Sequence, residues 1–339
     1  MTNLSELTTL HVGGPAQQVV KVQTESELIA AVQAGDSTGT PLLIIGGGSN
    51  LLVGDAGFAG TVIVVETTGN SYEIDACSGG MLQVAAGVDW DEFVAFTLEK
   101  RLANLESLSG IPGTVGAAPI QNIGAYGHEV SEVIARVRTY DRKDKAVRTF
   151  TADQCEFSYR DSIFKREAGR YVILDVTFQL RRGEHSLPIK YKELADALGV
   201  ELDTRAPTDQ VRKAVLNLRA KKGMLVDAQH HNQSAGSFFV NPIITPEVAA
   251  TLPEEAPRWP QPDGKIKVSA AWLMEHAGVT KGESLNGAKI SDHHVLALAN
   301  AGSATADDII SLAKSARDRV HAKFGITLIP EVRFVGVEF

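Results

Sequence analysis

Cysteine is scarce in this sequence, and no apolar stretch is long. The only two cysteines in 339 residues, Cys77 and Cys155, form no CxxC pair, so there is no spaced-cysteine framework for disulfides or a metal. Purely apolar runs, such as 41–45 and 62–65, are far shorter than the roughly 20 residues that a membrane-spanning helix needs. The opening MTNLSELTTL lacks the basic and then apolar pattern of a secretory signal. We therefore expect a cytoplasmic protein that has no membrane association.

Positive charge is also in short supply. There are 33 lysines and arginines against 41 aspartates and glutamates, a formal net charge of −8. A nucleic-acid surface needs a basic stripe to displace counterions, so we expect no nucleic-acid partner. A phosphate-bearing small molecule is still compatible, because a few local donors suffice for it. Hydrophobic residues make up 44% of the chain, which is typical of soluble globular proteins, and its length predicts two or three domains.

Strand and helix signals alternate in the first 70 residues. Thr24 and Glu27 form a capping box, which predicts a helix that begins after Thr24 and ends at Gly35. Strands are predicted over 18–22, 41–46 and 61–66. This order of elements predicts a small α/β unit with at least partly parallel strands.

Two further regions come after this unit. A helix is predicted over 89–102, with Asp89 as its N-cap, and a strand over 171–180, in which alternate residues face opposite sides. A longer helix is predicted from Thr305, with Ile309, Leu312, Ala316, Val320 and Phe324 on one face. The other predictions are strands over 81–87, 129–141, 146–151 and 331–339, helices over 208–222 and 269–278, and a proline-containing loop over 253–262.

Two glycine-rich segments carry the strongest functional signal. LIIGGGSNLLVG, residues 43–54, places three glycines directly after a predicted buried strand. Glycines allow successive backbone N–H groups to point into one concavity, which suits a phosphate, although an ordinary strand-to-turn connection is the alternative. Neither GxGxxG nor GxxxxGK[ST] occurs here, so an ordinary dinucleotide fold is not supported. SGIPGTVGAAPIQNIGAYG, residues 109–127, is too apolar for disorder and predicts a backbone wall against a ligand.

The order of the motifs GGGSNLL, SGIPGTVGAAPIQNIGAYG, YRDSIFK, GSFFVNP and PEVRF resembles the UDP-N-acetylenolpyruvoylglucosamine reductase family over nearly the whole chain. The resemblance implies an α+β, vanillyl-alcohol-oxidase-like two-part FAD-binding fold with a third α/β substrate-binding domain. It places the FAD-binding parts at 1–70 and 71–222, the substrate-binding domain at 223–324, and 325–339 near the active site. The length and a tyrosine at Tyr191 resemble the longer form of the family. The stretch TTLHVGG departs from the family pattern, because Leu10 stands where an aromatic is usual.

The resemblance also implies an activity and cofactors. The expected reaction is the NADPH-dependent, FAD-mediated reduction of UDP-N-acetylglucosamine enolpyruvate to UDP-N-acetylmuramate, in peptidoglycan precursor synthesis. It implies noncovalent FAD and a monomer. The residues that it implies for FAD binding are Gly46, Gly47, Gly48, Ser49, Asn50, Leu51, Ser109, Gly110, Gly113, Thr114, Gly116, Ala117, Gln121, Asn122, Gly124, Ala125 and Tyr126.

Three residues are implied as catalytic. Arg160 would stabilise charge that develops on the substrate carboxylate, since a guanidinium binds a carboxylate through two parallel hydrogen bonds. The alternative is a surface arginine paired with Asp161 or Asp175. Ser237 would deliver the proton, and its alternative is an ordinary serine at the start of a strand.

Glu331 is the third catalytic candidate. As the substrate is reduced, negative charge would spread into its carboxylate, and an ionised Glu331 beside this dianion would be repelled. We therefore expect Glu331 to be protonated, or bound tightly to Arg160, when that charge develops. The alternative is a surface ion pair with Arg333 of small energy.

The substrate-binding candidates are Tyr159, Tyr191, Arg219, Lys222 (or Lys221) and Asn241. Asn241 is included because Ser237, Phe239 and Asn241 would share one face of a strand. The alternative for the basic residues is a solvated helix end, which the helix dipole favours.

The histidines raise the questions of a metal site and of covalent flavin attachment, and two other functions compete with the reductase. The pairs His230–His231 and His293–His294 lack carboxylates at a suitable spacing, so we expect no metal. His11 and His128 are candidates for covalent flavin attachment, which the resemblance argues against. A flavin-dependent sugar or alcohol oxidase and a non-catalytic nucleotide-sugar binding module are the competing functions.

Overall fold

The computed structural model describes residues 2–75, 79–225 and 233–339, in two compact units. Unit 1 contains residues 1–15, 48–58 and 222–339, and unit 2 contains residues 16–47 and 59–221. Cys77 and the pair His230–His231 lie outside the described residues. No helix in the described part of the chain is long and apolar enough to cross a membrane. The three-part division of the chain at residues 70 and 222 stays a prediction.

Unit 2 begins with a three-stranded sheet in the order β1-β4-β2, where β2 and β4 are parallel, as predicted. The capping box of Thr24 and Glu27 is confirmed at the start of α1, but the predicted end at Gly35 is wrong. Gly35 lies inside the helix, where a Cβ would come within 2.4 Å of the Leu42 side chain, and Gly39, with φ of +69°, ends it. The elements are β1 (Ala16–Val22), α1 (Glu25–Thr38), β2 (Leu42–Ile45) and β4 (Phe58–Val65).

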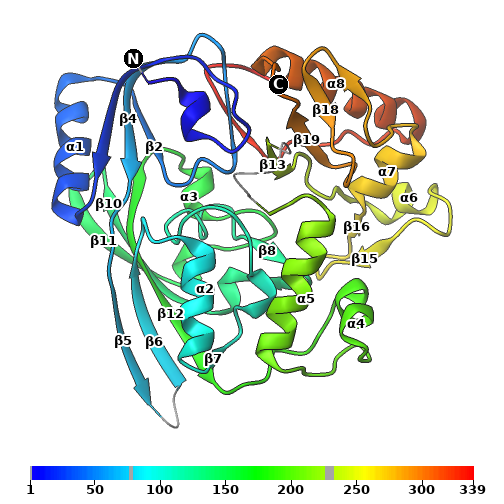
Figure 1. Cartoon of the computed structure of the whole chain (residues 1–339), viewed down its shortest axis with the longest axis horizontal. Helices are drawn as coiled ribbons and strands as arrows, with labels where there is room; N and C mark the ends of the chain where they lie inside the picture. The colour runs from blue at the N-terminus through cyan, green and yellow to red at the C-terminus, as the bar shows by residue number, and fades with distance from the viewer. Residues whose placement is uncertain (1, 76–78, 226–232) are drawn as a thin grey trace. The chain divides into compact units, whose positions relative to one another are not determined.

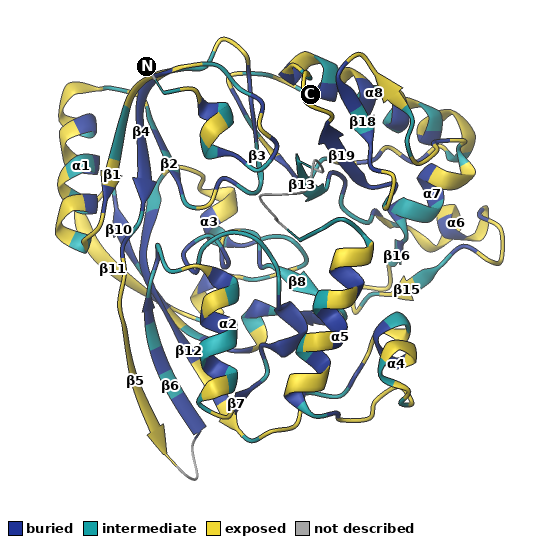
Figure 2. Cartoon of the chain, in the orientation of Figure 1, coloured by how far each residue is buried: buried dark blue, intermediate teal, exposed yellow. Residues whose placement is uncertain are grey.

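The larger sheet of unit 2 runs β11-β10-β12-β6-β5, and β7 pairs with β12. The predicted strand over 171–180 is confirmed as β12, but neither of its faces is open to solvent, since residues 172–178 are all buried. Figure 2 shows the contrast between this buried strand and the exposed edge strand β5. The strand predicted over 129–141 begins only at Ile134. The strands are β5 (Asn70–Asp75), β6 (Gly79–Ala85), β7 (Leu102–Ala103), β10 (Ile134–Asp141), β11 (Ala146–Thr151) and β12 (Tyr171–Arg182).

Helices and short elements complete unit 2 (Figure 1). Asp89 is the N-cap of α2, as predicted, because its side chain accepts the N–H of Glu92; the helix ends at Glu99 rather than at residue 102. The helices are α2 (Trp90–Glu99), α3 (Ile163–Arg166), α4 (Lys192–Leu198) and α5 (Thr208–Lys221), the 3₁₀ turns are η2 (Glu106–Leu108), η3 (Val130–Glu132) and η4 (Asp153–Cys155), and the short strands are β8 (Gly124–Ala125) and β9 (His128–Glu129).

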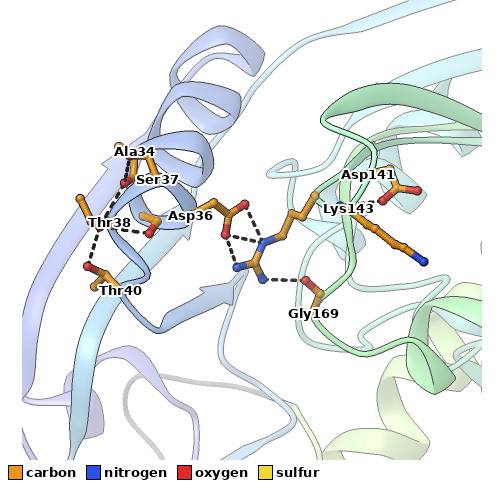
Figure 3. Close-up of polar contacts among 10 residues, drawn as sticks. Ala34, Asp36, Ser37, Thr38, Thr40, Asp141, Lys143 and Gly169 are labelled. Carbon is orange, nitrogen blue, oxygen red and sulfur yellow. Dashed lines mark hydrogen bonds and ion pairs between the residues drawn. The ribbon is translucent and has the colours of Figure 1, made fainter.

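Arg142 joins α1 to the larger sheet. It follows β10, and its guanidinium donates to the Asp36 carboxylate near the end of α1, with an Nη2–Oδ1 distance of 2.5 Å. It also donates to the carbonyl of Gly169 at 2.6 Å. Figure 3 labels Asp36 and Gly169, the two partners of Arg142. Helix α1 and the larger sheet are therefore held together by an ion pair, and both contribute residues to one hydrophobic core.

Unit 1 contains a four-stranded sheet in the order β13-β19-β18-β17, a three-stranded sheet β14-β16-β15, and the parallel pair β20-β3. The predicted helix from Thr305 is confirmed as α8, whose Ile309, Leu312, Ala316 and Val320 are buried. The expected strand over 331–339 is only β20, and the proline-containing loop includes strand β15. The remaining elements are η1 (Leu4–Leu7), β3 (Leu51–Val53), β13 (Gln233–Ser237), β14 (Ile243–Ile244), α6 (Pro246–Ala250), β15 (Arg258–Pro260), β16 (Ile266–Val268), α7 (Ala270–His276), β17 (Ser284–Leu285), β18 (Ala288–Ile290), β19 (Ala297–Asn300), α8 (Ala306–Phe324) and β20 (Arg333–Val335).

The position of Ser237 differs from the prediction. Ser237 is the last residue of β13 and pairs with Ala297, rather than standing at the start of a strand. The register shifts between Ser234 and Ser237, and Gly236 has a φ of +74°, which only glycine adopts readily. Phe239 and Asn241 therefore do not follow Ser237 along one strand face, and that argument for Asn241 fails.

Candidate active site

The two glycine-rich segments touch through their backbones within unit 2. A Cβ on Gly46 would come within 2.3 Å of the Thr114 hydroxyl oxygen, and one on Gly47 would come within 3.0 Å of the Gly113 Cα. A Cβ on Gly116 would be 2.5 Å from Ala86. Glycine is required at these positions because another chain segment occupies the space where a side chain would be. The glycines thus bring the main chain of one turn against that of the other.

Asn122 holds the middle of the loop formed by residues 109–127, which we call the glycine-rich loop. It is fully buried, with a φ of +47°. Its amide nitrogen donates to Glu129 at 2.6 Å and to the carbonyl of Ser158 at 3.1 Å, and its amide oxygen accepts the N–H of Ser131 at 3.1 Å. Asn122 therefore fixes the shape of the loop, and its predicted contact with FAD stays a prediction.

Arg160 lies beside the same loop. Its Nη2 donates to the carbonyl of Gly124 at 2.7 Å, and its Nη1 donates more weakly to the carbonyl of Asn122 at 3.4 Å. The alternative partners of Arg160 are engaged by other arginines, Asp161 by Arg166 and Asp175 by Arg138. These contacts place the guanidinium of Arg160 at the glycine-rich loop, and its catalytic role stays a prediction. Tyr159 lies with its ring centroid 5.7 Å from the guanidinium carbon.

Tyr126 and Tyr191 form an aromatic pair at the end of the loop. Their ring centroids are 5.7 Å apart in an edge-to-face arrangement. Burial raises the pKa of Tyr126 to about 12, although the charge of Arg219 acts in the opposite direction. Tyr191 keeps 37% of its surface exposed. The segment before Tyr191 contacts the residue that follows the loop, since the His128 ring and the carbonyl of Pro188 lie 3.1 Å apart, at hydrogen-bonding distance.

Of the basic candidates near the end of α5, Arg219 is buried, whereas Lys221 is exposed and Lys222 is partly exposed. Arg219 is only 9% exposed, and its Nε donates to the carbonyl of Gly110 at 2.9 Å. Burial lowers the pKa of Arg219, against the effect of Tyr126 and Asp91. Its predicted contact with the substrate phosphates stays a prediction, as does that of Lys222.

Unit 1 brings three of the sequence motifs together. The N–H of Glu331 donates to the carbonyl of Phe238, directly after Ser237, at 2.8 Å. Asn50 of the motif GGGSNLL donates through its side chain to the carbonyl of Glu331 at 3.2 Å. Its own carbonyl accepts the N–H of Arg333 at 3.0 Å. One short network of hydrogen bonds thus includes Glu331 and Phe238, the residue after Ser237.

Asn241 has a structural bond of its own. Its side-chain oxygen accepts the N–H of Ala270, the first residue of α7, at 2.9 Å. Its substrate contact stays a prediction. Of the second histidine pair, the Nδ1 of His294 accepts the N–H of Leu296 at 3.1 Å. Among residues 2–75, 79–225 and 233–339 there is no group of three or more His, Cys, Asp or Glu side chains that could hold a metal ion.

Sequence reasoning missed Asp91. This residue lies in the first turn of α2, where we noted only the helix. The structure shows its carboxylate accepting the N–H of Gly110 at 2.6 Å and pairing with Arg212 of α5. Acidic residues are common in the first turn of a helix because the helix dipole favours them there. No local signal therefore shows that Asp91 also binds Gly110 and Arg212.

The geometry fits a bound flavin nucleotide. Close backbone packing at Gly46, Gly47 and Gly116 leaves main chain rather than side chains at these turns, and such turns offer N–H groups to a phosphate. Hydrogen bonds of Asn122, Arg160 and Arg219 hold the glycine-rich loop in its conformation. These features define a protein with an FAD-binding fold, and residues 16–149 match the family model described as FAD binding domain.

The particular family is indicated by the rest of the chain. Residues 228–335 match the family model of the C-terminal domain of UDP-N-acetylenolpyruvoylglucosamine reductase. The reductase of that name from Cutibacterium acnes is 52% identical, with 98% of this chain and 89% of that protein covered. The one from Streptomyces coelicolor is 47% identical, with 98% and 89% covered. A crystal structure of the reductase from Thermus caldophilus has a TM-score of 0.67 at 26% identity, and covers 98% of this chain and 97% of that one.

The chain therefore belongs to the UDP-N-acetylenolpyruvoylglucosamine reductase family, whose members are FAD-dependent oxidoreductases of peptidoglycan precursor synthesis. The resemblance, the fold class and the FAD cofactor predicted from the sequence are confirmed. The assignment of individual residues to FAD, substrate or catalysis is not tested by these similarities and stays a prediction.

Proposed function

We propose that this protein reduces UDP-N-acetylglucosamine enolpyruvate to UDP-N-acetylmuramate, with NADPH as the reductant. The observation that carries the proposal is the hydrogen-bonded connection of GSFF, PEVRF and GGGSNLL in unit 1, through Phe238, Glu331 and Asn50. Three motifs far apart in the sequence would not need to converge in a protein that only binds a nucleotide sugar. The relatives named above are reductases of this substrate class.

Bound FAD supplies the redox chemistry, which is hydride transfer from NADPH to the terminal alkene carbon of the substrate. The residues of the chain have to stabilise the charge and supply the proton at the neighbouring carbon. Negative charge develops there and spreads into the adjacent carboxylate. Arg160 is proposed to stabilise that charge, since its guanidinium stays protonated and can bond both carboxylate oxygens. Its bonds to the loop carbonyls at Gly124 and Asn122 support this role, because they hold the guanidinium in one place.

Ser237 is the proposed proton donor. A serine hydroxyl is a weak acid, but the carbon that it would protonate is strongly basic. The left-handed conformation of Gly236 and the backbone bond of Phe238 to Leu296, at 2.7 Å, fix the main chain on both sides of Ser237. A fixed main chain is what a proton donor needs, since misplacement by about 1 Å can cost about 100-fold in rate.

Glu331 is proposed to be protonated when the charge develops, because an ionised carboxylate beside a dianion is repulsive. Its main chain is anchored on both sides of the side chain, by its N–H to Phe238 and by its carbonyl to Asn50. We propose Tyr159, Tyr191, Arg219, Lys222 and Asn241 as substrate contacts. We also propose that the protein acts in the cytoplasm as a monomer.

The deciding experiment separates the two half-reactions of Ser237→Ala. NADPH should still bleach the flavin absorbance, whereas reoxidation by the enolpyruvyl substrate should slow by about 100-fold or more. Ser311→Ala is the control, because Ser311 is an exposed serine on α8 and should leave both half-reactions unchanged. Normal reoxidation in Ser237→Ala would remove Ser237 from the mechanism. A wild-type protein that consumes no NADPH but reduces oxygen would instead indicate an oxidase.

A further inference from the structure

The N-terminal end of α2 contacts the glycine-rich loop and the residue before it at three points. The N–H of Trp90 donates to the carbonyl of Gly113 at 3.0 Å. The indole N–H of Trp90 donates to the carbonyl of Leu108 at 2.9 Å, and this side chain is almost fully buried. The carboxylate of Asp91 accepts the N–H of Gly110 at 2.6 Å. Two adjacent residues of one helix therefore hold both ends of the segment from Leu108 to Gly113.

Asp91 is held in turn by Arg212 of α5. The two guanidinium nitrogens of Arg212 donate to the two carboxylate oxygens of Asp91 at 2.6 and 2.8 Å, which is the two-pronged geometry of strong pairs. Burial alone would raise the pKa of Asp91, but the hydrogen bonds from Arg212 and from the Gly110 N–H lower it below the usual range. Asp91 is therefore ionised at neutral pH and accepts from both partners at once.

Helix α5 also holds Gly110 from its other side. Arg219 donates through Nε to the Gly110 carbonyl at 2.9 Å. Arg212 and Arg219 are seven positions apart in the sequence, about two helical turns, so they lie along the same side of α5. Gly110 has a φ of +70°, and both its N–H and its carbonyl are bound by side chains. The peptide groups on either side of this flexible residue thus have one orientation.

We propose that Asp91 and Arg212 are positioning residues that hold the start of the glycine-rich loop in the conformation that binds FAD. The proposal rests on the assignment of this loop to the flavin in the function proposed above. A glycine-rich segment that must become ordered on binding loses conformational entropy, and this loss weakens binding. Holding Gly110 in advance removes part of that cost. Neither side chain needs to touch the flavin.

The test is the affinity of the apoprotein for FAD, measured by quenching of flavin fluorescence on titration. Asp91→Ala and Arg212→Ala should each raise the dissociation constant about tenfold. Asp91→Ala removes the carboxylate that accepts the Gly110 N–H, and Arg212→Ala removes the guanidinium that holds this carboxylate. The double variant should be little worse than either single one, because the two side chains act through one interaction. Arg212→Lys keeps the charge but loses the two-pronged geometry and should fall between wild type and Arg212→Ala.

A second measurement does not depend on FAD. Amide hydrogen exchange at Gly110 in the apoprotein should become about tenfold faster in Asp91→Ala, since its N–H loses its acceptor. The exchange rate tests whether Asp91 holds the Gly110 N–H even if too little of a variant is obtained for an FAD titration.

The matched control is Asp36→Ala. It breaks a two-pronged ion pair with Arg142 that also holds a backbone carbonyl, that of Gly169, in the same unit. This control should lower the melting temperature but leave the affinity for FAD unchanged. The proposal is wrong if Asp91→Ala and Arg212→Ala behave like this control, with lowered melting temperature and wild-type FAD affinity.

These measurements need neither NADPH nor the sugar nucleotide. A wild-type protein that binds FAD but leaves the enolpyruvyl substrate unreduced would contradict the proposed function alone. Unchanged FAD affinity in both variants of a fully active enzyme would contradict the positioning role alone.

Discussion

The backbone N–H of Glu331 donates a hydrogen bond of 2.8 Å to the carbonyl of Phe238, the residue that follows Ser237. The bond lies beside an isolated bridge between Phe239 and Pro330, and beside a bond from the N–H of Val240 to the carbonyl of Ile329. The main chains that carry two proposed catalytic groups are therefore paired directly. A displacement of one segment moves the other.

Asn50 offers the first test of this pairing. Its side chain donates to the carbonyl of Glu331, so Asn50→Ala removes a bond that fixes the segment. We expect reoxidation of the flavin by the enolpyruvyl substrate to slow about tenfold, because the segments that carry Glu331 and Ser237 lose their fixed positions. Rapid-mixing measurements of both half-reactions check this.

Asn50 was predicted from the sequence as an FAD contact, and the same experiment separates the two roles. A direct contact with FAD would raise the dissociation constant of FAD and leave the second half-reaction intact once the protein is saturated. An affinity near that of wild type with slow reoxidation would support the role through Glu331. Asn50→Asp is a useful companion, because it keeps the size of the side chain but replaces the N–H donor with an acceptor.

Phe339 packs against the same segment and gives the second prediction. Its ring stacks on Phe334 with centroids 5.5 Å apart and lies 6.1 Å from the rings of both Phe238 and Phe239. Phe339→Ala should destabilise the protein by about 2 kcal/mol, somewhat less than for a fully buried phenylalanine, because Phe339 is partly exposed. Phe339→Leu should recover most of this loss.

Calorimetry of the apoprotein measures the effect as a lower melting temperature. Ile329→Ala is the control, since Ile329 is 62% exposed, and a surface change of this kind is usually within about 0.5 kcal/mol of neutral. Equal stabilities of Phe339→Ala and Ile329→Ala would show that the aromatic cluster contributes nothing to holding the segment after Ser237.

Local chemistry explains which parts of the fold were predictable. The cap at Asp89 and the box of Thr24 and Glu27 depend on residues within one helical turn, and both were predicted correctly. The end of α1 was not, because Gly35 serves close packing against Leu42, a contact that a sequence pattern cannot show. The glycine thus had a tertiary role where a cap was expected.

The site was predictable to the level of motifs but not of contacts. Ser237 was expected to share a strand face with Phe239 and Asn241, whereas β13 ends at Ser237, which pairs with Ala297 of β19. Long-range partners also explain why Asp91 was missed, since Arg212 lies on a helix far along the chain. Motif order identified the family, while the positioning of each side chain depends on contacts between distant segments.

The third prediction concerns pH and the ion pair of Glu283 with Arg319 of α8. Arg319 donates to both carboxylate oxygens, and one of these distances is 3.2 Å. The hydrogen bond from Arg319 lowers the pKa of Glu283 below the usual glutamate range, although burial acts against it. Because the folded-state pKa lies below the unfolded value of about 4.3, the pair stabilises the protein above that pH. The contribution is lost as the pH falls through the lowered pKa.

We therefore expect Glu283→Gln to be less stable than wild type by about 1–2 kcal/mol from pH 7 to pH 5. This difference is smaller than for a buried ion pair, because both side chains are partly exposed. The difference should shrink below about pH 4, where wild-type Glu283 also becomes neutral. Urea unfolding of both proteins at a series of pH values measures it. Glu275→Gln, a change at an exposed glutamate on α7, should show no such pH-dependent difference. A gap between wild type and Glu283→Gln that stays constant down to pH 3 would mean that the carboxylate charge does not carry the stabilisation, and that the packing of the side chain does.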